Sequence, residues 1–295
     1  MQKKIIRHEH PSNAHMVGDG FRIAQYIPGY GREMNPDTSP FLMLDYNAPW
    51  HIPPQQDGHR PGVGFHPHRG FETVTIVYSG EVEHEDTAGH GGVIGPNEVQ
   101  WMTAGSGLLH NEFMTEKFSR NGGIQHAVQL WVDLPKEKKM TTPRYQALTR
   151  ENIPEVSFEF GRVRVIAGTF RGQKGAAETF SPIELLDVRF EQSGELKLEF
   201  PKGYNTMILV AEGSISANSE VMQNGDMFYF SIDGEEILLE TEGNAKILIM
   251  AGKPLGQNVV NYGPFVMTTE QEIIEAWEDF RAGKMGVVEM EDESM

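Results

Sequence analysis

Two histidines, His66 and His68, limit the fold and the chemistry open to this chain more than any other feature of it. They precede an apolar, β-branched run over residues 71–78 that ends at Ser79-Gly80, a pattern typical of a β-strand. Side chains two positions apart on a strand project from the same face. We therefore expect both imidazoles to point the same way, about 7 Å apart, so that one cation can contact both rings.

A second pair with the same spacing, His110 and Glu112, lies downstream, after a flexible Gly-Ser-Gly segment. If the two pairs occupy neighbouring strands, three nitrogens and one carboxylate converge inside a barrel. Such a set suits a first-row transition metal with coordination positions left open. The alternative is that each histidine is an ordinary strand or loop residue. Two pairs at strand spacing favour the metal site over that alternative.

The rest of the chain predicts an all-β fold. From residue 65 onward, short apolar runs alternate with turn signals, which is typical of a β-barrel or sandwich. The two halves also echo each other, since residues 96–101 resemble residues 224–229. We predict two tandem β-barrels, with residues 1–134 as a metal-binding barrel, residues 135–145 as a linker and residues 146–295 as the second barrel.

The second barrel is expected to be free of metal. The last histidine of the chain is His126, so none falls in the second half. The positions that the duplication matches to the ligand pairs hold Glu199, Pro201 and Leu238. Near the N-terminus, His8 and His10 form another histidine pair without an acidic partner pair, and we expect them to be surface residues.

One helix is predicted near the C-terminus. Thr269 and Glu272 form a capping box. Ile273, Trp277 and Phe280 then follow at helical spacing, which gives the helix an apolar face that should pack onto a barrel.

Composition narrows the possible functions. The chain contains no cysteine, which excludes disulfides, a thiolate nucleophile and cysteine-based zinc or iron–sulfur sites. Its formal net charge of −17 disfavours direct nucleic-acid binding and is compatible with a protein partner. No apolar run reaches the ~18 residues of a membrane span, and the N-terminus lacks the apolar segment of a secretory signal. We expect a cytoplasmic protein that binds neither nucleic acid nor membrane.

The chain resembles the pirins, which are two-barrel, jelly-roll members of the cupin superfamily. The segments that carry the resemblance are His66-Pro67-His68-Arg69-Gly70-Phe71-Glu72-Thr73-Val74, Gln100-Trp101-Met102-Thr103-Ala104-Gly105, His110-Asn111-Glu112, Gln129-Leu130-Trp131-Val132-Asp133-Leu134-Pro135 and Tyr262-Gly263-Pro264-Phe265-Val266-Met267. The resemblance implies that His66, His68, His110 and Glu112 bind iron and that the C-terminal barrel is metal-free. Fe(II) is the expected ion, with Mn, Ni, Cu, Co and Zn as alternatives.

Two other residues near the ligand pairs, Glu72 and Asn111, are not expected to bind the metal. In many other cupins a glutamate shortly after the first histidine pair is itself a ligand, and Glu72 stands at such a position. The pirin pattern takes its carboxylate from Glu112, so we expect Glu72 to be a supporting or structural acid. Asn111 should point away from the metal.

The resemblance also implies a function. Bacterial pirins resemble quercetin dioxygenases, so the first hypothesis is an iron-dependent dioxygenase that acts on a flavonol such as quercetin with dioxygen. In this hypothesis Glu112 is both ligand and catalytic base, and Phe65 and Phe71 could line the mouth of the site. The alternative is a non-enzymatic iron-binding regulator that binds a transcription factor or a metabolic enzyme. A third hypothesis, a structural zinc site, would require closed tetrahedral coordination.

Overall fold

Burial along the strands shows how the molecule is layered. The structure is a computed structural model that describes residues 1–10, 14–27 and 37–288. Strands β6 (Phe71–Ser79) and β19 (Asn205–Glu212) are buried on both faces over nearly their whole length, whereas β18 (Gly194–Glu199) and β23 (Glu236–Thr241) alternate between buried and more exposed residues. A strand buried on both faces needs a layer on each side. Strands β6 and β19 therefore belong to inner sheets, and β18 and β23 belong to an outer sheet.

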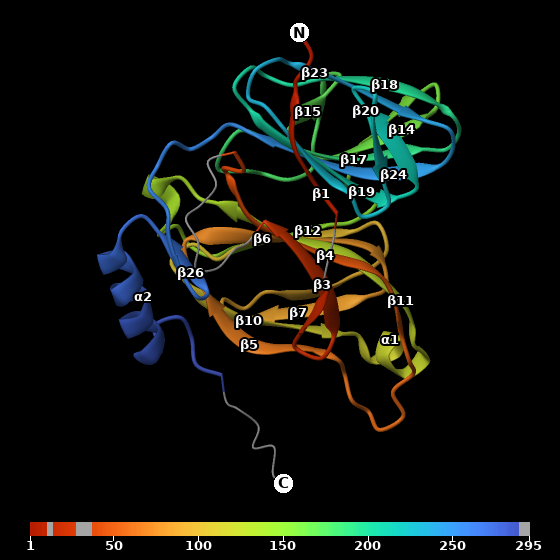
Figure 1. The fold of residues 1–295 in the computed structure, drawn as a ribbon. Coiled ribbons are helices and arrows are strands. Elements are labelled where there is room, and N and C mark those ends of the chain that lie inside the picture. Colours follow the sequence, from red (N-terminus) through yellow and green to blue (C-terminus); the bar gives the residue numbers. More distant parts are fainter. Residues whose placement is uncertain (11–13, 28–36, 289–295) are drawn as a thin grey trace.

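The chain forms two units, each with a seven-stranded and a four-stranded sheet, stacked one above the other in Figure 1. All pairings between the named strands are antiparallel in the part of the chain that the structure describes. In the first unit the larger sheet has the order β12 (Arg144–Leu148), β9 (Val99–Thr103), β6, β11 (Gly123–Asp133), β4 (Phe41–Ile52), β3 (Phe21–Ile27) and β2 (His15–Val17). The smaller sheet has the order β5 (Gly62–His68), β10 (Leu108–Met114), β7 (Val82–Asp86) and β8 (Gly91–Ile94).

The second unit repeats this arrangement. Its larger sheet has the order β1 (Ile5–Glu9), β22 (Met227–Phe230), β19, β24 (Ala245–Gly252), β17 (Ile183–Phe190), β14 (Gly161–Ala167) and β13 (Glu155–Phe158). Its smaller sheet has the order β18, β23, β20 (Ser214–Ala217) and β21 (Glu220–Gln223). Two short ribbons and three helical segments complete the described chain: β15 (Thr169–Phe170) with β16 (Gln173–Lys174), β25 (Val260–Tyr262) with β26 (Phe265–Met267), α1 (Glu116–Asn121), η1 (Lys136–Lys138) and α2 (Glu270–Arg281).

The interiors of the two units differ in chemistry. One apolar cluster lies between the two seven-stranded sheets and includes Tyr46 and Leu130 from the first unit and Leu209 and Leu248 from the second. A second cluster of apolar side chains fills the second unit between its own sheets. In the first unit, buried histidine, glutamine and glutamate side chains occupy the corresponding space. Because burying polar groups is unfavourable unless they are satisfied, we expect a functional site in the interior of the first unit.

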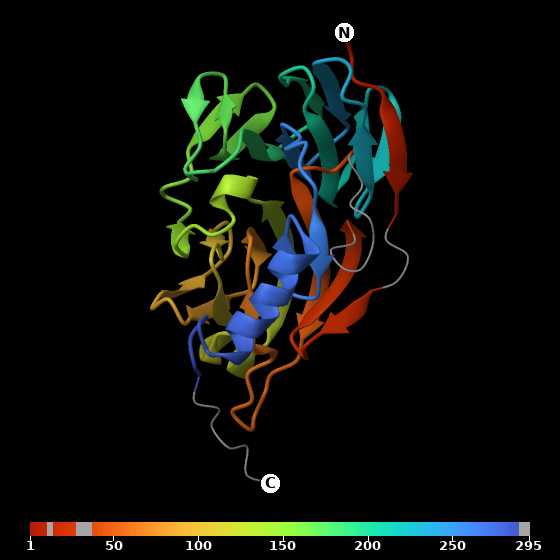
Figure 2. The same cartoon turned by 90° about the vertical axis from the view of Figure 1, so that its left-hand side faces the viewer.

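Both ends of the chain cross between the units. Strand β1 pairs with β22, and the exposed His8 and His10 both contact Asp226 of the second unit. At the other end, residues 260–281, here called the C-terminal arm, return to the first unit, where Figure 2 shows α2 lying over its strands. There Arg69 bonds to Asp279 at 2.9 Å. The division of the chain at residues 134 and 146 stays a prediction, and these crossings span it.

The predicted C-terminal helix is confirmed. Thr269 accepts a hydrogen bond from the backbone N–H of Glu272, whose side chain reaches back to the backbone N–H of Thr269, so the capping box is complete. The apolar face of α2 packs with Phe265, and the Trp277 ring lies 5.0 Å from the Phe265 ring. Across residues 1–10, 14–27 and 37–288, neither α-helix has the length and apolar character needed to span a membrane.

Candidate metal centre

Strand register brings the two ligand pairs together. Strand β10 lies between β5 and β7 in the smaller sheet of the first unit, and His110 on β10 stands opposite His66 on β5. His68, two residues after His66 on β5, stands opposite Leu108 on β10. The two pairs thus occupy neighbouring antiparallel strands, as the sequence predicts.

Three imidazoles gather at one point. His66, His68 and His110 each offer a ring nitrogen, and these nitrogens lie within 4.8 Å of one another. His68 and His110 are buried, whereas His66 is partly exposed. Burial, together with the neighbouring imidazoles, holds the pKa values of His68 and His110 well below their usual range. Both rings are therefore neutral at pH 7 and carry a lone pair that can bind a metal.

Hydrogen bonds decide which nitrogen of each ring is free. The Nδ1 of His66 lies 2.9 Å from the carbonyl oxygen of Gly64, and the Nδ1 of His68 lies 3.3 Å from that of Pro264. A carbonyl oxygen only accepts, so each Nδ1 carries the proton and each Nε2 is left as a possible ligand. This is the usual arrangement of a metal-binding histidine.

The third ring contains an unpartnered atom. The Nε2 of His110 is buried and has no hydrogen-bond partner within the described residues. Buried polar atoms without a partner are rare and call for an explanation such as an ion. A metal ion held by the three Nε2 atoms would satisfy this nitrogen, so the residues present fit a metal ion.

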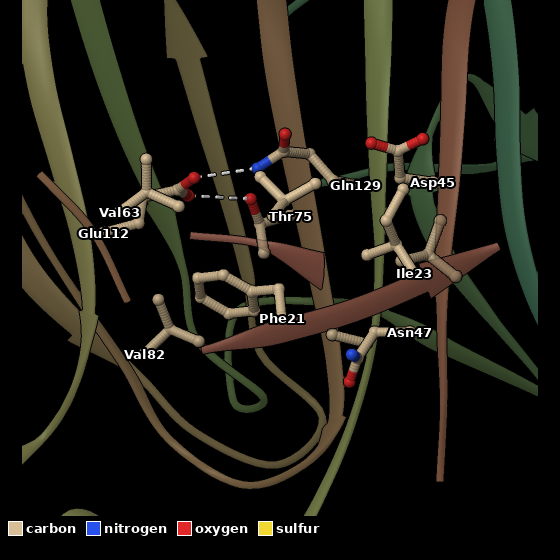
Figure 3. A pocket seen from close by; sticks show the side chains of 12 residues that line it. Phe21, Ile23, Asp45, Asn47, Val63, Thr75, Val82, Glu112 and Gln129 are labelled. Carbon is tan, nitrogen blue, oxygen red and sulfur yellow. Dashed lines mark hydrogen bonds between the residues drawn. The ribbon is translucent and has the colours of Figure 1, made fainter. Parts of the chain in front are cut away.

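Glu112, the fourth predicted ligand, takes a different position. Its carboxylate accepts hydrogen bonds from Gln129 Nε2 at 2.8 Å, Gln100 Nε2 at 3.2 Å and Thr75 Oγ1 at 3.3 Å. Figure 3 shows the bonds from Gln129 and Thr75. These three bonds hold the carboxylate against the larger, inner sheet. Its role as a ligand stays a prediction.

The structure groups Glu112 with a different pair of histidines. Potential ligand atoms of His84, His110 and Glu112 lie within 4.8 Å of one another, and all three residues are buried. His110 is therefore common to both groups of three found in the described chain. His84 is not among the site residues predicted from the sequence. The available signal was a further i, i+2 pair, His84 and Asp86, on the strand that follows Ser79-Gly80.

A cavity of about 50 Å³ lies beside Glu112 inside the first unit (Figure 3). Its lining is largely apolar, with a few polar side chains between them. The lining residues are Val17, Phe21, Ile23, Asp45, Asn47, Val63, Thr75, Val82, Glu112, Ala127, Val128 and Gln129. Burial raises the pKa of Asp45 to about 7, so this carboxyl can be protonated near neutral pH. The cavity has space for a few water molecules, since one water needs roughly 10–15 Å³.

The remaining predicted residues take ordinary positions. Glu72 belongs to neither histidine group; it is buried on β6 and accepts a hydrogen bond from Thr103 Oγ1 at 2.7 Å. Asn111 is more exposed than His110 and Glu112 on either side of it, as expected for a side chain on the opposite face of β10. Phe71 is fully buried against Trp131, and Phe65 packs near the C-terminal arm. Packing accounts for both phenylalanines.

Comparison with protein families supports the resemblance seen in the sequence. The family model described as Pirin matches residues 20–132, and the model of the pirin C-terminal cupin domain matches residues 185–286. The two units with paired sheets are therefore the two tandem cupin jelly rolls that the sequence predicts.

Individual relatives align over nearly the whole chain. A Pseudomonas aeruginosa protein named as a candidate quercetin 2,3-dioxygenase is 43% identical over 284 residues, which cover 96% of this chain and 98% of that protein. The rat protein named pirin is 36% identical over 277 residues, covering 91% of this chain and 89% of its own. A crystal structure of quercetin 2,3-dioxygenase from Acinetobacter baumannii is 42% identical, has a TM-score of 0.92 and covers 98% of this chain and 100% of that one.

Proposed function

The chain belongs to the pirin family, and we propose that it binds one Fe(II) ion in its first unit and acts as a dioxygenase on a flavonol such as quercetin. The observation that carries the proposal is the group of three imidazoles, in which His66 and His68 keep Nε2 free and His110 has an unpartnered Nε2. Relatives named for this activity support the substrate class. We propose that the protein works in the cytoplasm.

The donor set favours iron without requiring it. His66, His68 and His110 would hold the ion, with Glu112 as the fourth ligand. Imidazole and carboxylate donors with open positions are typical of non-haem Fe(II) oxygenases, and Mn, Ni, Cu, Co and Zn accept the same donor types. When bound, the metal supplies Lewis acidity toward a substrate hydroxyl and redox capacity toward dioxygen.

Glu112 is the proposed acceptor of the substrate hydroxyl proton. Its carboxylate is buried and is held in place by Gln129, Gln100 and Thr75, so the base is positioned before the substrate arrives. A positioned base contributes typically 10²–10⁴-fold in rate.

The cavity beside Glu112 is too small to hold a flavonol without movement of its lining. Ligand pockets usually measure about 300–1,000 Å³, whereas this cavity measures about 50 Å³. A flavonol that reaches Glu112 from this side must therefore displace lining side chains such as Phe21 and Val63. Its apolar lining suits an aromatic ring, while Asn47, whose buried Oδ1 has no partner within the described residues, offers an acceptor to a phenolic hydroxyl.

Oxygen consumption by the Fe(II)-reconstituted protein with a panel of flavonols tests the proposal. We expect uptake by the wild type and a reduction of about 10²–10⁴-fold for Glu112→Gln. Glu72→Gln is the matched control, because Glu72 is also a buried glutamate but lies outside both histidine groups. All variants must be compared at equal metal occupancy.

Two results would count against this proposal. Equal activity of Glu112→Gln and the wild type would refute the role of Glu112 as base. No uptake with any flavonol by the metal-loaded wild type would favour the alternative, a non-enzymatic regulator with a protein partner. The net charge of −17 makes nucleic acid a poor candidate for that partner.

A further inference from the structure

We propose that His84 and Asp86 are positioning residues that fix His110 in the tautomer and orientation needed to bind the metal. Both lie on β7, the neighbour of β10, where Asp86 stands opposite His110 and His84 stands opposite Glu112. His84, Asp86 and His110 are all buried. The inference rests on the metal centre proposed above and adds two residues that lie behind it.

The hydrogen bonds of His84 determine its tautomer from both sides of the ring. Its Nε2 lies 3.4 Å from Oδ2 of Asp86, a carboxylate that can only accept, so this nitrogen carries the proton. Its Nδ1 lies 3.4 Å from Nε2 of Gln100, an amide nitrogen that can only donate, so Nδ1 is the acceptor. The two partners assign the same neutral tautomer independently.

The orientation of the Gln100 amide is itself fixed by its neighbours. Its Oε1 accepts from the hydroxyl of Tyr145 at 3.3 Å, and its Nε2 donates to the Glu112 carboxylate at 3.2 Å. Exchanging the amide oxygen and nitrogen would place the oxygen against the Glu112 carboxylate. The donor that faces His84 is therefore the nitrogen.

The tautomer of His110 follows from that of His84. The Nδ1 atoms of the two rings are 3.3 Å apart. Nδ1 of His84 carries no proton, so Nδ1 of His110 must be the donor of this pair, and its N–H shares the lone pair of His84 Nδ1 with Gln100 Nε2. The single ring proton of neutral His110 therefore lies on Nδ1. The remaining nitrogen, Nε2, is the buried atom without a partner, and it is left with its lone pair. The chain from Asp86 through His84 thus presents Nε2 of His110 to the metal, in the way that carboxylates orient histidine ligands elsewhere.

The far end of this chain is anchored by the turn after β7. Asp86 Oδ1 accepts the backbone N–H groups of Ala88 at 2.9 Å and His90 at 3.0 Å, and Oδ2 lies 3.1 Å from Nδ1 of His90. Burial acts to raise the pKa of Asp86, but the hydrogen bonds from His84 and His90 outweigh it and lower that pKa. Asp86 is therefore an anionic, fixed acceptor.

The ring of His84 is also held in place by stacking. It lies on the ring of Tyr145, with the centroids 5.0 Å apart and an interplanar angle of 13°. Tyr145 is on β12 of the larger sheet, so both sheets of the first unit contribute to placing His110.

The tautomer of His110 in the metal-free wild type is the first test. Nitrogen-15 NMR is expected to show Nδ1 protonated and Nε2 unprotonated. A protonated Nε2 would overturn the proposal. This measurement needs neither a variant nor bound metal, so it decides the proposal even if the wild type binds no metal, a result that would refute the proposed centre itself.

Metal affinity, measured by competition with a chelator, is the second test. His84→Leu removes the acceptor and should weaken Fe(II) binding by about 10–100-fold. His84→Asn offers Oδ1 in place of Nδ1 and should retain most of the affinity. The matched control is His126→Leu, because His126 is also a buried histidine of the first unit but belongs to neither histidine group; it should bind metal like the wild type.

If His84 served only in packing, His84→Leu would retain metal affinity better than His84→Asn, since leucine fills a buried site better than asparagine. Equal affinity of His84→Leu and the wild type, in protein that is folded by circular dichroism, would overturn the proposal. The same holds if His84→Asn binds as weakly as His84→Leu.

Discussion

Lys139 is expected to be a main anchor of the C-terminal arm, and replacing it by methionine tests this. Its ammonium group is almost completely buried and donates to Asp133 Oδ1 at 2.6 Å, Gly70 O at 2.8 Å and Val266 O at 2.9 Å. One side chain therefore ties together a strand of the inner sheet, the turn after His68 and the arm.

The expected loss of stability in Lys139→Met comes from the buried polar groups that lose their partner. The substitution leaves the Asp133 carboxylate buried, with Gln257 Nε2 at 2.8 Å among its remaining donors, and it deprives two backbone carbonyls of this donor. Breaking a buried ion pair by removing one partner typically costs about 3–5 kcal/mol. Replacing both partners by apolar residues is often close to neutral, so Lys139→Met combined with Asp133→Leu should recover much of the loss.

Urea denaturation of the metal-free protein measures these changes as differences in the free energy of unfolding. Lys197→Met is the matched control, since Lys197 forms an exposed ion pair with Glu236 and its loss should have no measurable effect. The arm also supplies the carbonyl of Pro264 to His68, so Lys139→Met should weaken metal binding as well. A change below about 1 kcal/mol, the range of a surface pair, would refute the reasoning.

Three further predictions concern the first unit. His68→Ala should abolish most metal affinity while the protein stays folded, because stability comes mainly from apolar burial between sheets; circular dichroism and metal titration check this together, and outright unfolding would contradict it. Burial raises the pKa of Glu72 to about 7, above its unfolded value of about 4.3, so the folded state keeps a proton that the unfolded state loses and stability falls as the pH rises between these values. Glu72→Gln should remove this fall and be more stable than the wild type at pH 8 by about 4 kcal/mol; unchanged pH dependence of unfolding would contradict it. Gly70→Ala should destabilise the protein and weaken metal binding, because Gly70 has φ +88° and a Cβ there would lie 2.0 Å from the carbonyl oxygen of Val266; denaturation and metal titration would show neither effect if the arm adjusts freely.

Much of the fold and part of the site could be predicted from local sequence patterns. The i, i+2 spacing of His66 and His68 correctly placed both rings on one face, although their centroids lie 4.8 Å apart, closer than the expected separation of about 7 Å. The turn signals predicted an all-β chain of two similar halves. The capping box at Thr269 located the start of α2. Each of these features depends on residues close together in the sequence, where local geometry is decisive.

Several features that depend on distant residues were not predicted. Nothing in the local pattern indicates that Pro264 returns to bond with His68 or that β1 joins the sheet of the other unit. The same holds for Glu112, since parity places its side chain inside but does not show that Gln129 and Gln100 bind its carboxylate. Cross-strand register and the return of the C-terminal arm are set by tertiary packing.

The role of His84 also could not be predicted from the sequence. Its pairing with Asp86 has the same i, i+2 spacing as the predicted ligand pairs, but spacing alone does not distinguish a ligand from a residue behind a ligand. Only the register of β7 against β10 shows that Asp86 lies opposite His110.

Metal content is the most direct test of the centre built on three histidines. The protein should be purified without added metal, reconstituted with Fe(II) under anaerobic conditions and analysed for metal after removal of excess ion, alongside a folded His110→Ala variant. We expect one equivalent per chain in the wild type and almost none in the variant, because His110 belongs to both ligand groups of the described chain. Two equivalents or none in the wild type, or one equivalent in His110→Ala, would contradict the account.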